Sequence, residues 1–110
     1  MLLLTFSSDV FSQCLVWQDE FNTSSLDLAK WKYTTGNGCG GPSGCGFGNG
    51  ELQYYTSGTN NITVGGGNLS ITARYQPNYL GSGNNYTSGK ISTEGLASWK
   101  YGRMEARIQV

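Results

Sequence analysis

Carboxylates are the side chains that could act as acid, base or nucleophile, and there are few of them. Two carboxyls that act on one sugar bond must face each other across it, roughly 5 Å apart in a retaining enzyme and farther apart in an inverting one. Asp19 and Glu20 are adjacent on an expected strand, so they point to opposite faces and cannot pair. Glu51 and Glu94 stand alone, which leaves no complete catalytic constellation in the chain. The seven acidic residues are Asp9, Asp19, Glu20, Asp27, Glu51, Glu94 and Glu105.

Other classes of chemistry and partner find little support. The chain has no histidine, and so lacks the usual imidazole base and the commonest metal ligand. Glu105 stands between Arg103 and Arg107 and is interpreted as a surface ion-pairing residue. Seven basic residues balance seven acidic ones. Nothing in the charge therefore favours a nucleic acid or an anionic membrane as partner.

A set of aromatic and amide side chains would suit the binding of sugar. Sugars place their C–H faces on aromatic rings and form hydrogen bonds with amides and charged donors in open clefts. For any single ring, a place in the core or in a cross-strand pair is the stronger alternative. Phe47 and Asn49 are exceptions because they lie in a glycine-rich loop. The full set is Phe47, Asn49, Tyr54, Tyr55, Tyr86, Trp99 and Tyr101.

The elements that must position these residues are short strands. The last stretch alternates strictly, which predicts a half-buried strand with a small and apolar inner face. The pattern continues to Val110, so we interpret the chain as the front part of a larger β domain. Further strands are expected at 15–18, 51–56, 61–64 and 69–75. The predicted inner-face residues are Gly102, Met104, Ala106, Ile108 and Val110 in the last strand, and Leu69, Ile71, Ala73 and Tyr75 in the one at 69–75.

Turns and loops separate these strands. Residues 65–68 (GGGN) predict a hairpin turn, which needs positive φ. One helical turn is expected within 26–33, with Ser25 as its N-cap. Loops as long as the glycine-rich stretch 34–50 are usually functional in compact domains. With 17 glycines and only 13% charged residues, the composition is typical of an all-β extracellular protein, and short strands between turns indicate a sandwich or barrel.

Residues 1–13 begin apolar and end in small or polar residues, which predicts part of a secretory signal peptide and leaves 14–110 as the domain. The apolar run is too short to span a bilayer. An ordinary N-terminal strand is the alternative, and Cys14 is a weaker candidate for a lipid anchor. Cys39 and Cys45 bracket five small residues, a loop that can close a disulfide in an oxidising compartment. Two free thiols are the alternative there.

Several motifs, in this order, resemble the N-terminal part of the catalytic domain of glycoside hydrolase family 16, above all the bacterial laminarinases, which are endo-1,3-β-glucanases. The resemblance covers nearly the whole chain after the leader. It implies a jelly-roll fold of the concanavalin A type, which is an all-β antiparallel sandwich and is incomplete here. The motifs are LVWQDEFN, LAKWKY, GFGNGELQYYT, NLSITAR, YTSGKIST and WKYGRMEARIQV.

The resemblance also implies an activity, the retaining hydrolysis of internal β-1,3 or β-1,3-1,4 glucan bonds. In the family a Glu nucleophile and a Glu acid/base share one strand in an E-x-D-x-x-E pattern, or the same pattern without one x. We expect that pattern beyond residue 110 and assign no catalytic residue in this chain. No cofactor is implied for catalysis. The complete protein is expected to be a secreted or cell-surface monomer that binds β-glucan.

Individual residues match family positions. Asn49 matches an asparagine that bonds the substrate, and Phe47 stands where a tryptophan or tyrosine usually stacks on a sugar. Lys90 replaces an arginine that bonds sugar hydroxyls, so it keeps the charge but loses the bidentate fork. Glu20 and Gly67 match backbone-carbonyl ligands of a structural calcium, whose third ligand would come from beyond this chain.

Two other functions stay open. A non-catalytic polysaccharide-binding sandwich would use the same aromatic and amide residues without hydrolysis. A structural or adhesive sandwich would place all the rings in its core. The glucan itself is not fixed by the resemblance, because agarose, carrageenan and xyloglucan are also cleaved by proteins of this fold.

Overall fold

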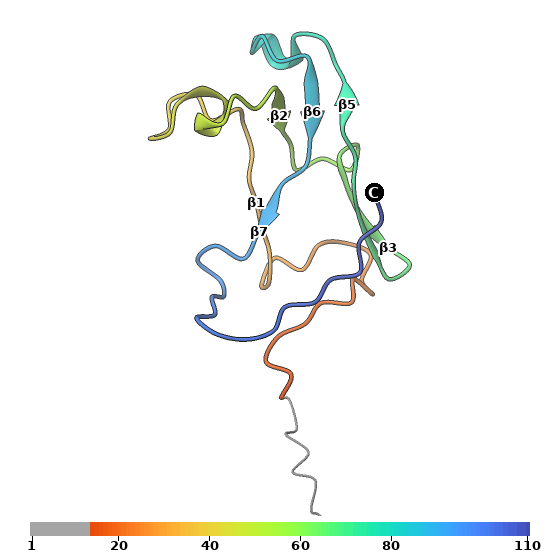
Figure 1. Ribbon diagram of the computed structural model, residues 1–110. Helices are drawn as coiled ribbons and strands as arrows, with labels where there is room; N and C mark the ends of the chain where they lie inside the picture. The colour runs from red at the N-terminus through yellow and green to blue at the C-terminus, as the bar shows by residue number, and fades with distance from the viewer. Residues whose placement is uncertain (1–13) are drawn as a thin grey trace, which may run out of the picture.

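The computed structural model describes residues 14–110, where every regular element except two short 3-10 turns is a β-strand (Figure 1). The prediction of an all-β chain is confirmed. The predicted signal peptide, residues 1–13, lies outside the described residues. The strands are β1 (Lys32–Tyr33), β2 (Gln53–Tyr55), β3 (Ile62–Gly65), β4 (Asn68–Ile71), β5 (Arg74–Tyr75), β6 (Tyr86–Ser88) and β7 (Ile91–Ser92), and the 3-10 turns are η1 (Cys45–Gly48) and η2 (Tyr79–Gly81).

Among the described residues, no helix has the length and apolar character needed to cross a membrane.

The strands pair in three small sheets. β2, β6 and β5 lie side by side, β1 pairs with β7, and β3 pairs with β4 (Figure 1). Three of these four pairs are antiparallel, as predicted, but β2 and β6 run parallel. The expectation of purely antiparallel pairing is therefore wrong at this point. A parallel pair needs a long crossover, and the chain between Tyr55 and Tyr86 is long enough to supply it.

The β3–β4 hairpin forms where the glycines predict it. Gly66 and Gly67 occupy the turn with φ of 60° and 75°, a backbone conformation that side chains rarely adopt. Ile62 pairs with Ile71 at the open end, and Gly65 pairs with Asn68 next to the turn. The two-residue turn fixes this register, as expected for a tight hairpin.

The strand predicted at 69–75 is wrong as a single element. It is interrupted at residues 72 and 73, between β4 and β5. The amide of Thr72 donates to the carbonyl of Asn61 (2.8 Å), after which Arg74 and Tyr75 pair with β6 in another sheet. Because the chain changes partner here, the expected inner face is lost. The side chains of Ile71 and Tyr75 are 48% and 67% exposed.

Asn61 joins two of these sheets through its side chain and is only 2% exposed. Its Nδ2 donates to the carbonyl of Thr72 (2.8 Å) and to Oγ1 of Thr87 in β6 (3.1 Å). Its Oδ1 accepts from Oγ1 of Thr56, which follows β2 (2.6 Å). Buried amides carry a large desolvation cost unless they are satisfied, so this network fixes the hairpin against the three-stranded sheet.

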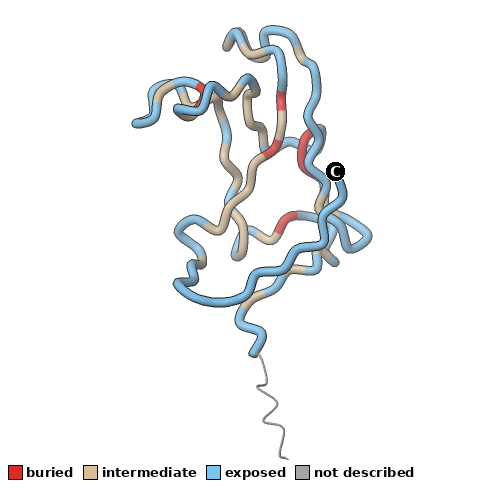
Figure 2. The backbone as a smooth tube through the Cα atoms, viewed as in Figure 1, coloured by how far each residue is buried: buried red, intermediate tan, exposed pale blue. Residues whose placement is uncertain are grey.

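The apolar core of the described residues is small. Leu26 and Ile62 are its buried hydrophobic side chains, and burial is confined to a few short stretches of the tube in Figure 2. Gly89 packs so closely on Ile62 that a Cβ there would lie 2.2 Å from Ile62 Cγ1. Many large apolar residues elsewhere, such as Leu52 and Met104, are exposed. A core this small is typical of part of a domain rather than of a complete one.

The first two elements predicted along the chain differ from the structure. Residues 15–18 form no strand, and Trp17 there packs edge-on against Trp31 and Trp99. Residues 26–33 contain a turn followed by β1 rather than a helical turn capped by Ser25. Asp27 supplies the cap instead, because its Oδ1 accepts from the amide of Ala29 (2.9 Å).

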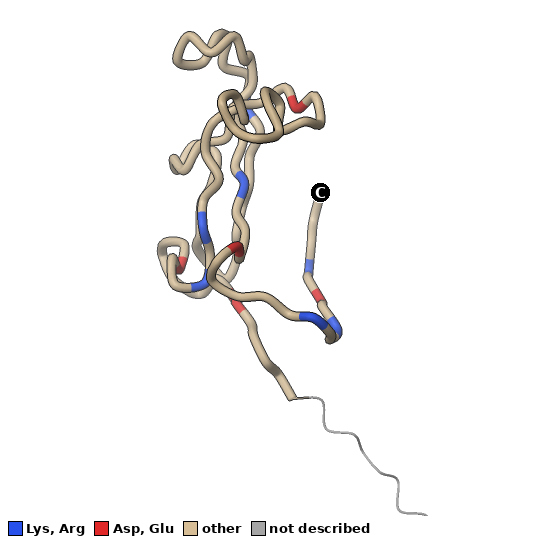
Figure 3. Tube along the Cα trace, turned by 90° about the vertical axis from the view of Figure 1, so that its left-hand side faces the viewer, with Lys and Arg blue, Asp and Glu red and all other residues tan. Residues whose placement is uncertain are grey.

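The terminal segment, residues 101–110, is not a strand, which corrects the clearest prediction from the alternating pattern. Every residue of it is exposed, and the tube runs apart from the strands in Figure 3. A strand needs a partner for its backbone groups, and no strand of the described chain pairs with it. The predicted surface ion pair does form, between Arg103 and Glu105.

Candidate functional site

Residues 34–50 form a loop that we call the clipped loop, because a disulfide closes part of it. This loop carries the first two predicted site residues, Phe47 and Asn49. A disulfide joins Cys39 to Cys45 at the start of η1. Gly46 is buried in this turn, and a Cβ there would lie 2.9 Å from the amide nitrogen of Glu51. Only glycine permits so close an approach at its φ of 63°. The loop backbone therefore folds tightly against the start of the segment that carries β2.

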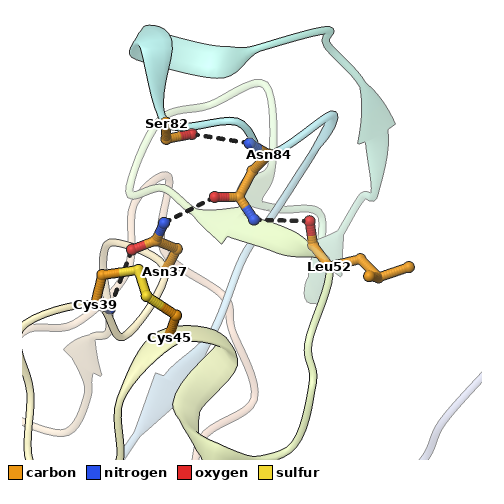
Figure 4. The surroundings of a disulfide bond; sticks show 6 residues. All are labelled: Asn37, Cys39, Cys45, Leu52, Ser82 and Asn84. Carbon is orange, nitrogen blue, oxygen red and sulfur yellow. Dashed lines mark hydrogen bonds between the residues drawn. A yellow bond between two sulfur atoms is a disulfide. The ribbon is translucent and has the colours of Figure 1, made fainter.

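A relay of asparagines holds the clipped loop against the next loop (Figure 4). Nδ2 of Asn37 donates to Oδ1 of Asn84 (2.8 Å), and Nδ2 of Asn84 donates to the carbonyl of Leu52 (2.9 Å). Oδ1 of Asn37 accepts from the amide of Cys39 (3.1 Å). The disulfide and the relay together fix the position of the residues that follow Cys45.

Phe47, Tyr55 and Lys90 meet on one side of β2. The rings of Phe47 and Tyr55 lie 5.5 Å apart, and Nζ of Lys90 is 5.0 Å and 5.3 Å from their centroids. Both distances are typical of cation–π contacts. The backbone holds Lys90 in place, because its carbonyl accepts from the amide of Thr34 (2.9 Å). Phe47 and Lys90, predicted separately from the sequence, thus form a single cluster.

Glu51 connects Asn49 to this cluster. Its Oε1 accepts from Nδ2 of Asn49 (3.4 Å) and its Oε2 from Nε2 of Gln53 (2.7 Å). A hydrogen bond from Tyr55 is the main cause that lowers the pKa of Glu51 from its ordinary 4.5, and the charge of Lys90 adds to it. Glu51 is therefore an anion at neutral pH. Burial, followed by the bond to Glu51, raises the pKa of Tyr55.

Sequence reasoning missed Glu51, Gln53 and Tyr55 as a group. Glu51 was expected to stand alone among the carboxylates, and the structure adds two amide partners, Asn49 and Gln53. The signal was present in the motif ELQYY, because alternate residues of a strand share a face. Reading positions 51, 53 and 55 together would have placed the carboxylate beside the amide and the phenol.

Three of the other aromatic candidates pack elsewhere, whereas Tyr101 is 84% exposed. The ring centroids of Tyr54 and Tyr79 lie 5.3 Å apart. Tyr86 pairs with Tyr75 across β5 and β6, with ring centroids 5.5 Å apart. Trp99 packs on Trp17, as described above. These rings follow the alternative expected for most of them, cross-strand or tertiary packing.

Glu20 and Gly67, the predicted calcium ligands, lie close together. A Cβ on Gly67 would be 3.8 Å from the carbonyl oxygen of Glu20 and 3.4 Å from Oδ1 of Asn22. Carbonyl and amide oxygens are the ligands that calcium prefers, so the residues present fit such an ion. Within residues 14–110, no three His, Cys, Asp or Glu side chains form a metal cluster. Calcium at this place remains a prediction.

The cluster has the chemistry of binding. Glu51 is its one carboxylate, and Asp19 lies apart, where its Oδ2 accepts from the indole Nε1 of Trp31 (2.7 Å). Retaining hydrolysis needs two facing carboxyls. Among the described residues, the cluster therefore brings together rings, a cation and an amide with a single carboxylate.

Comparison with known sequences gives named relatives, although no family model matches the chain. The chain is 48% identical over 98 residues to a β-glucanase of Rhodothermus marinus and 43% identical over 101 residues to glucan endo-1,3-β-glucosidase A1 of Niallia circulans. It is also 43% identical over 97 residues to the clotting factor G alpha subunit of Tachypleus tridentatus. Each match covers 87% of this chain but only 31%, 15% and 12% of these relatives, respectively.

Solved structures agree with the sequences. The laminarinase of Rhodothermus marinus matches 80% of this chain with 47% identity and a TM-score of 0.66, over 32% of its own length. SCLam, an endo-β-1,3(4)-glucanase of family GH16, matches 81% with 44% identity and a TM-score of 0.65, over 34% of its own length. Laminarinases of this family have the jelly-roll β-sandwich fold, which confirms the predicted fold class. In both sequence and backbone the chain is similar to glucanases of glycoside hydrolase family 16, and it spans about a third of these glucanase structures.

Proposed function

We propose that this chain forms part of the sugar-binding cleft of a retaining endo-β-1,3-glucanase. The observation that carries the proposal is the convergence of Phe47, Asn49 and Lys90 on one cluster. Rings, an ammonium group and an amide are the groups by which proteins hold neutral sugars. The names of the relatives, β-glucanase and glucan endo-1,3-β-glucosidase, support the same substrate class.

The role that we propose for each side chain follows from its chemistry. Lys90 donates hydrogen bonds to sugar hydroxyls, and Asn49, whose Nδ2 donates to Glu51, contributes an amide. The ring of Phe47 offers an apolar surface to the sugar ring. The carboxyl pair that cleaves the bond is expected outside these 110 residues, so this chain alone should bind glucan without hydrolysing it.

The test uses the protein encoded by the complete gene. We expect it to release reducing sugar from laminarin, and Lys90→Ala to weaken binding of a β-1,3-linked glucose tetrasaccharide about tenfold, because a charge-assisted hydrogen bond is lost. Lys32→Ala is the matched control, since Lys32 is exposed and forms an ion pair with Glu94 (3.5 Å) away from the cluster. Equal losses of affinity for the tetrasaccharide in the two variants would contradict the proposed site.

A non-catalytic glucan-binding module is the second candidate. It is favoured by one observation, the relative named as a clotting factor subunit rather than as a hydrolase. Such a module would bind laminarin and release no reducing sugar. Incubating the complete protein with laminarin and measuring both quantities separates the two functions.

Secretion and structural calcium complete the proposal. The disulfide in the clipped loop supports an oxidising compartment. The oxygens of Glu20 and Asn22 beside Gly67 support a calcium site that stabilises the fold. We expect added calcium to raise the melting temperature of the complete protein and a chelator to lower it, because a ligand that binds only the native state stabilises it.

A further inference from the structure

The clipped loop contains two Asn-Gly pairs, Asn37-Gly38 and Asn49-Gly50. Asparagine before glycine is prone to deamidation, because glycine has no side chain to shield its backbone nitrogen from the asparagine amide. The nitrogen attacks Cγ and gives up its proton, the bond from Cγ to Nδ2 breaks, and ammonia leaves. Water then opens the resulting succinimide ring to aspartate or isoaspartate. Both pairs have the residue types for this reaction, so their surroundings decide which one reacts.

Asn37-Gly38 is restrained at both residues. Oδ1 of Asn37 accepts from the amide of Cys39 (3.1 Å), and its Nδ2 donates to Oδ1 of Asn84 (2.8 Å), so the plane of the side-chain amide is fixed (Figure 4). A Cβ on Gly38 would lie 2.7 Å from the amide nitrogen of Phe47, so the backbone here is closely packed. Cγ of Asn37 cannot turn toward the glycine nitrogen unless these bonds break.

Asn49-Gly50 lacks these restraints. Both residues are exposed, and a Cβ on Gly50 would meet no atom within 4 Å. Among the described residues, the side chain of Asn49 forms one hydrogen bond, from Nδ2 to Oε1 of Glu51, and its length of 3.4 Å makes it weak. Within residues 14–110, the backbone N–H groups of Gly38 and Gly50 both donate to no acceptor. The two pairs therefore differ in how firmly the side-chain amide is held, not in the attacking nitrogen.

We propose that Asn49 is a deamidation site and that the bonds of Asn37 to Asn84 and Cys39 protect Asn37 from the same reaction. Both products carry a carboxylate where the amide of residue 49 stood. A carboxylate only accepts hydrogen bonds, so it cannot donate to Glu51, and two carboxylates this close repel each other. The reaction therefore breaks the contact between residue 49 and Glu51.

The effect of this reaction on binding rests on the proposed function. If Asn49 holds sugar through its amide, the deamidated protein should bind the glucose tetrasaccharide about tenfold more weakly, because a hydrogen-bond donor is lost. The deamidation itself does not depend on what the protein binds. Affinity should fall during storage at the rate at which Asn49 reacts.

The test incubates the complete protein at mildly alkaline pH and follows both asparagines by peptide mass spectrometry, with enzymatic methylation to detect isoaspartate. We expect Asn49 to react at least about tenfold faster than Asn37, because a fixed geometry keeps the reacting atoms apart. Asn84→Ala frees the amide of Asn37 and should narrow this difference. Asn49→Gln keeps an amide but lengthens the side chain, which disfavours ring closure, so its affinity should stay constant during the incubation.

The outcomes distinguish this inference from the proposed function. Equal rates at the two asparagines, a faster reaction at Asn37 or no reaction at either would overturn the inference, whatever the protein binds. An unchanged difference in Asn84→Ala would overturn the protection that we assign to the bonds of Asn37. Deamidation of Asn49 without loss of affinity would support the modification site and contradict the role of Asn49 in sugar binding. A fresh protein that binds no glucan would overturn the proposed function alone.

Discussion

The β3–β4 hairpin and the terminal segment carry the same kind of sequence and adopt different structures. Both alternate apolar with polar residues, yet residues 62–65 form a paired strand and residues 101–110 form none. Ile62 pairs with Ile71 and packs on Gly89, while Ile108 is 76% exposed. An alternating pattern indicates which face of a strand would be buried. The strand forms only where another strand pairs with its backbone groups.

The clipped loop is a third case that completes the comparison. It has no alternating pattern and little regular structure, yet it is held in place by the disulfide and by the bonds of Asn37 and Asn84. Local order in this chain therefore follows from contacts between segments rather than from pattern.

The largest expected effect is a difference in the free energy of unfolding between substitutions of Ile62 and Ile108. Ile62→Ala removes a buried side chain and should lower the free energy of unfolding of the 110-residue chain by about 3 kcal/mol. Ile108→Ala should change it by less than about 0.5 kcal/mol, because surface substitutions rarely do more. Urea denaturation of the two variants measures both. In a longer form of the protein that supplies a partner strand, Ile108→Ala should lower the free energy of unfolding as much as Ile62→Ala does. Equal losses of unfolding free energy in the 110-residue chain would contradict the comparison.

The order of the clipped loop should depend on its disulfide. Replacing Cys39 and Cys45 by serine should lower the free energy of unfolding by about 2 kcal/mol, the loop-entropy value for so short a closed loop. Binding of the glucose tetrasaccharide should weaken as well, because Phe47 follows Cys45 closely. Cys14→Ser, at the exposed free cysteine, is the control. An unchanged affinity in the double variant would show that the asparagine relay alone holds the loop.

The sequence predicted the parts of the fold that depend on local chemistry. The hairpin turn at residues 65–68 was predictable because only glycine tolerates the positive φ that the turn needs. The break between β4 and β5 was not, because it depends on a bond from the Thr72 amide to the Asn61 carbonyl, a contact that periodicity does not encode. The parallel pairing of β2 and β6 is likewise a choice between distant segments.

In the candidate site, too, the sequence predicted individual residues but not the contacts between them. Phe47, Asn49 and Lys90 could be proposed one by one from the motifs they stand in. The bonds of Glu51 with Asn49 and Gln53 could not be proposed in this way, because they depend on the conformation of the loop that leads into β2.

A smaller effect concerns the hairpin turn itself. Gly67→Ala forces a side chain into a backbone with φ of 75° and should cost about 1 kcal/mol. Gly65→Ala is the matched control, since a Cβ there meets nothing within 4 Å and its φ is not positive. Thermal unfolding of both variants checks the difference. Equal melting temperatures would mean that the turn is not what fixes the register of Ile62 with Ile71.

The smallest effect should come from the terminal segment's ion pair. Arg103 and Glu105 contact each other, but both side chains are 69% exposed, so solvent screens the attraction. A double-mutant cycle with Arg103→Ala and Glu105→Ala should therefore give a coupling of less than about 0.5 kcal/mol. A coupling above about 1 kcal/mol would show that the pair is held in one geometry, which requires the segment around it to be ordered. That result would undo the contrast with the hairpin, because the terminal segment would then have a fixed structure without a partner strand.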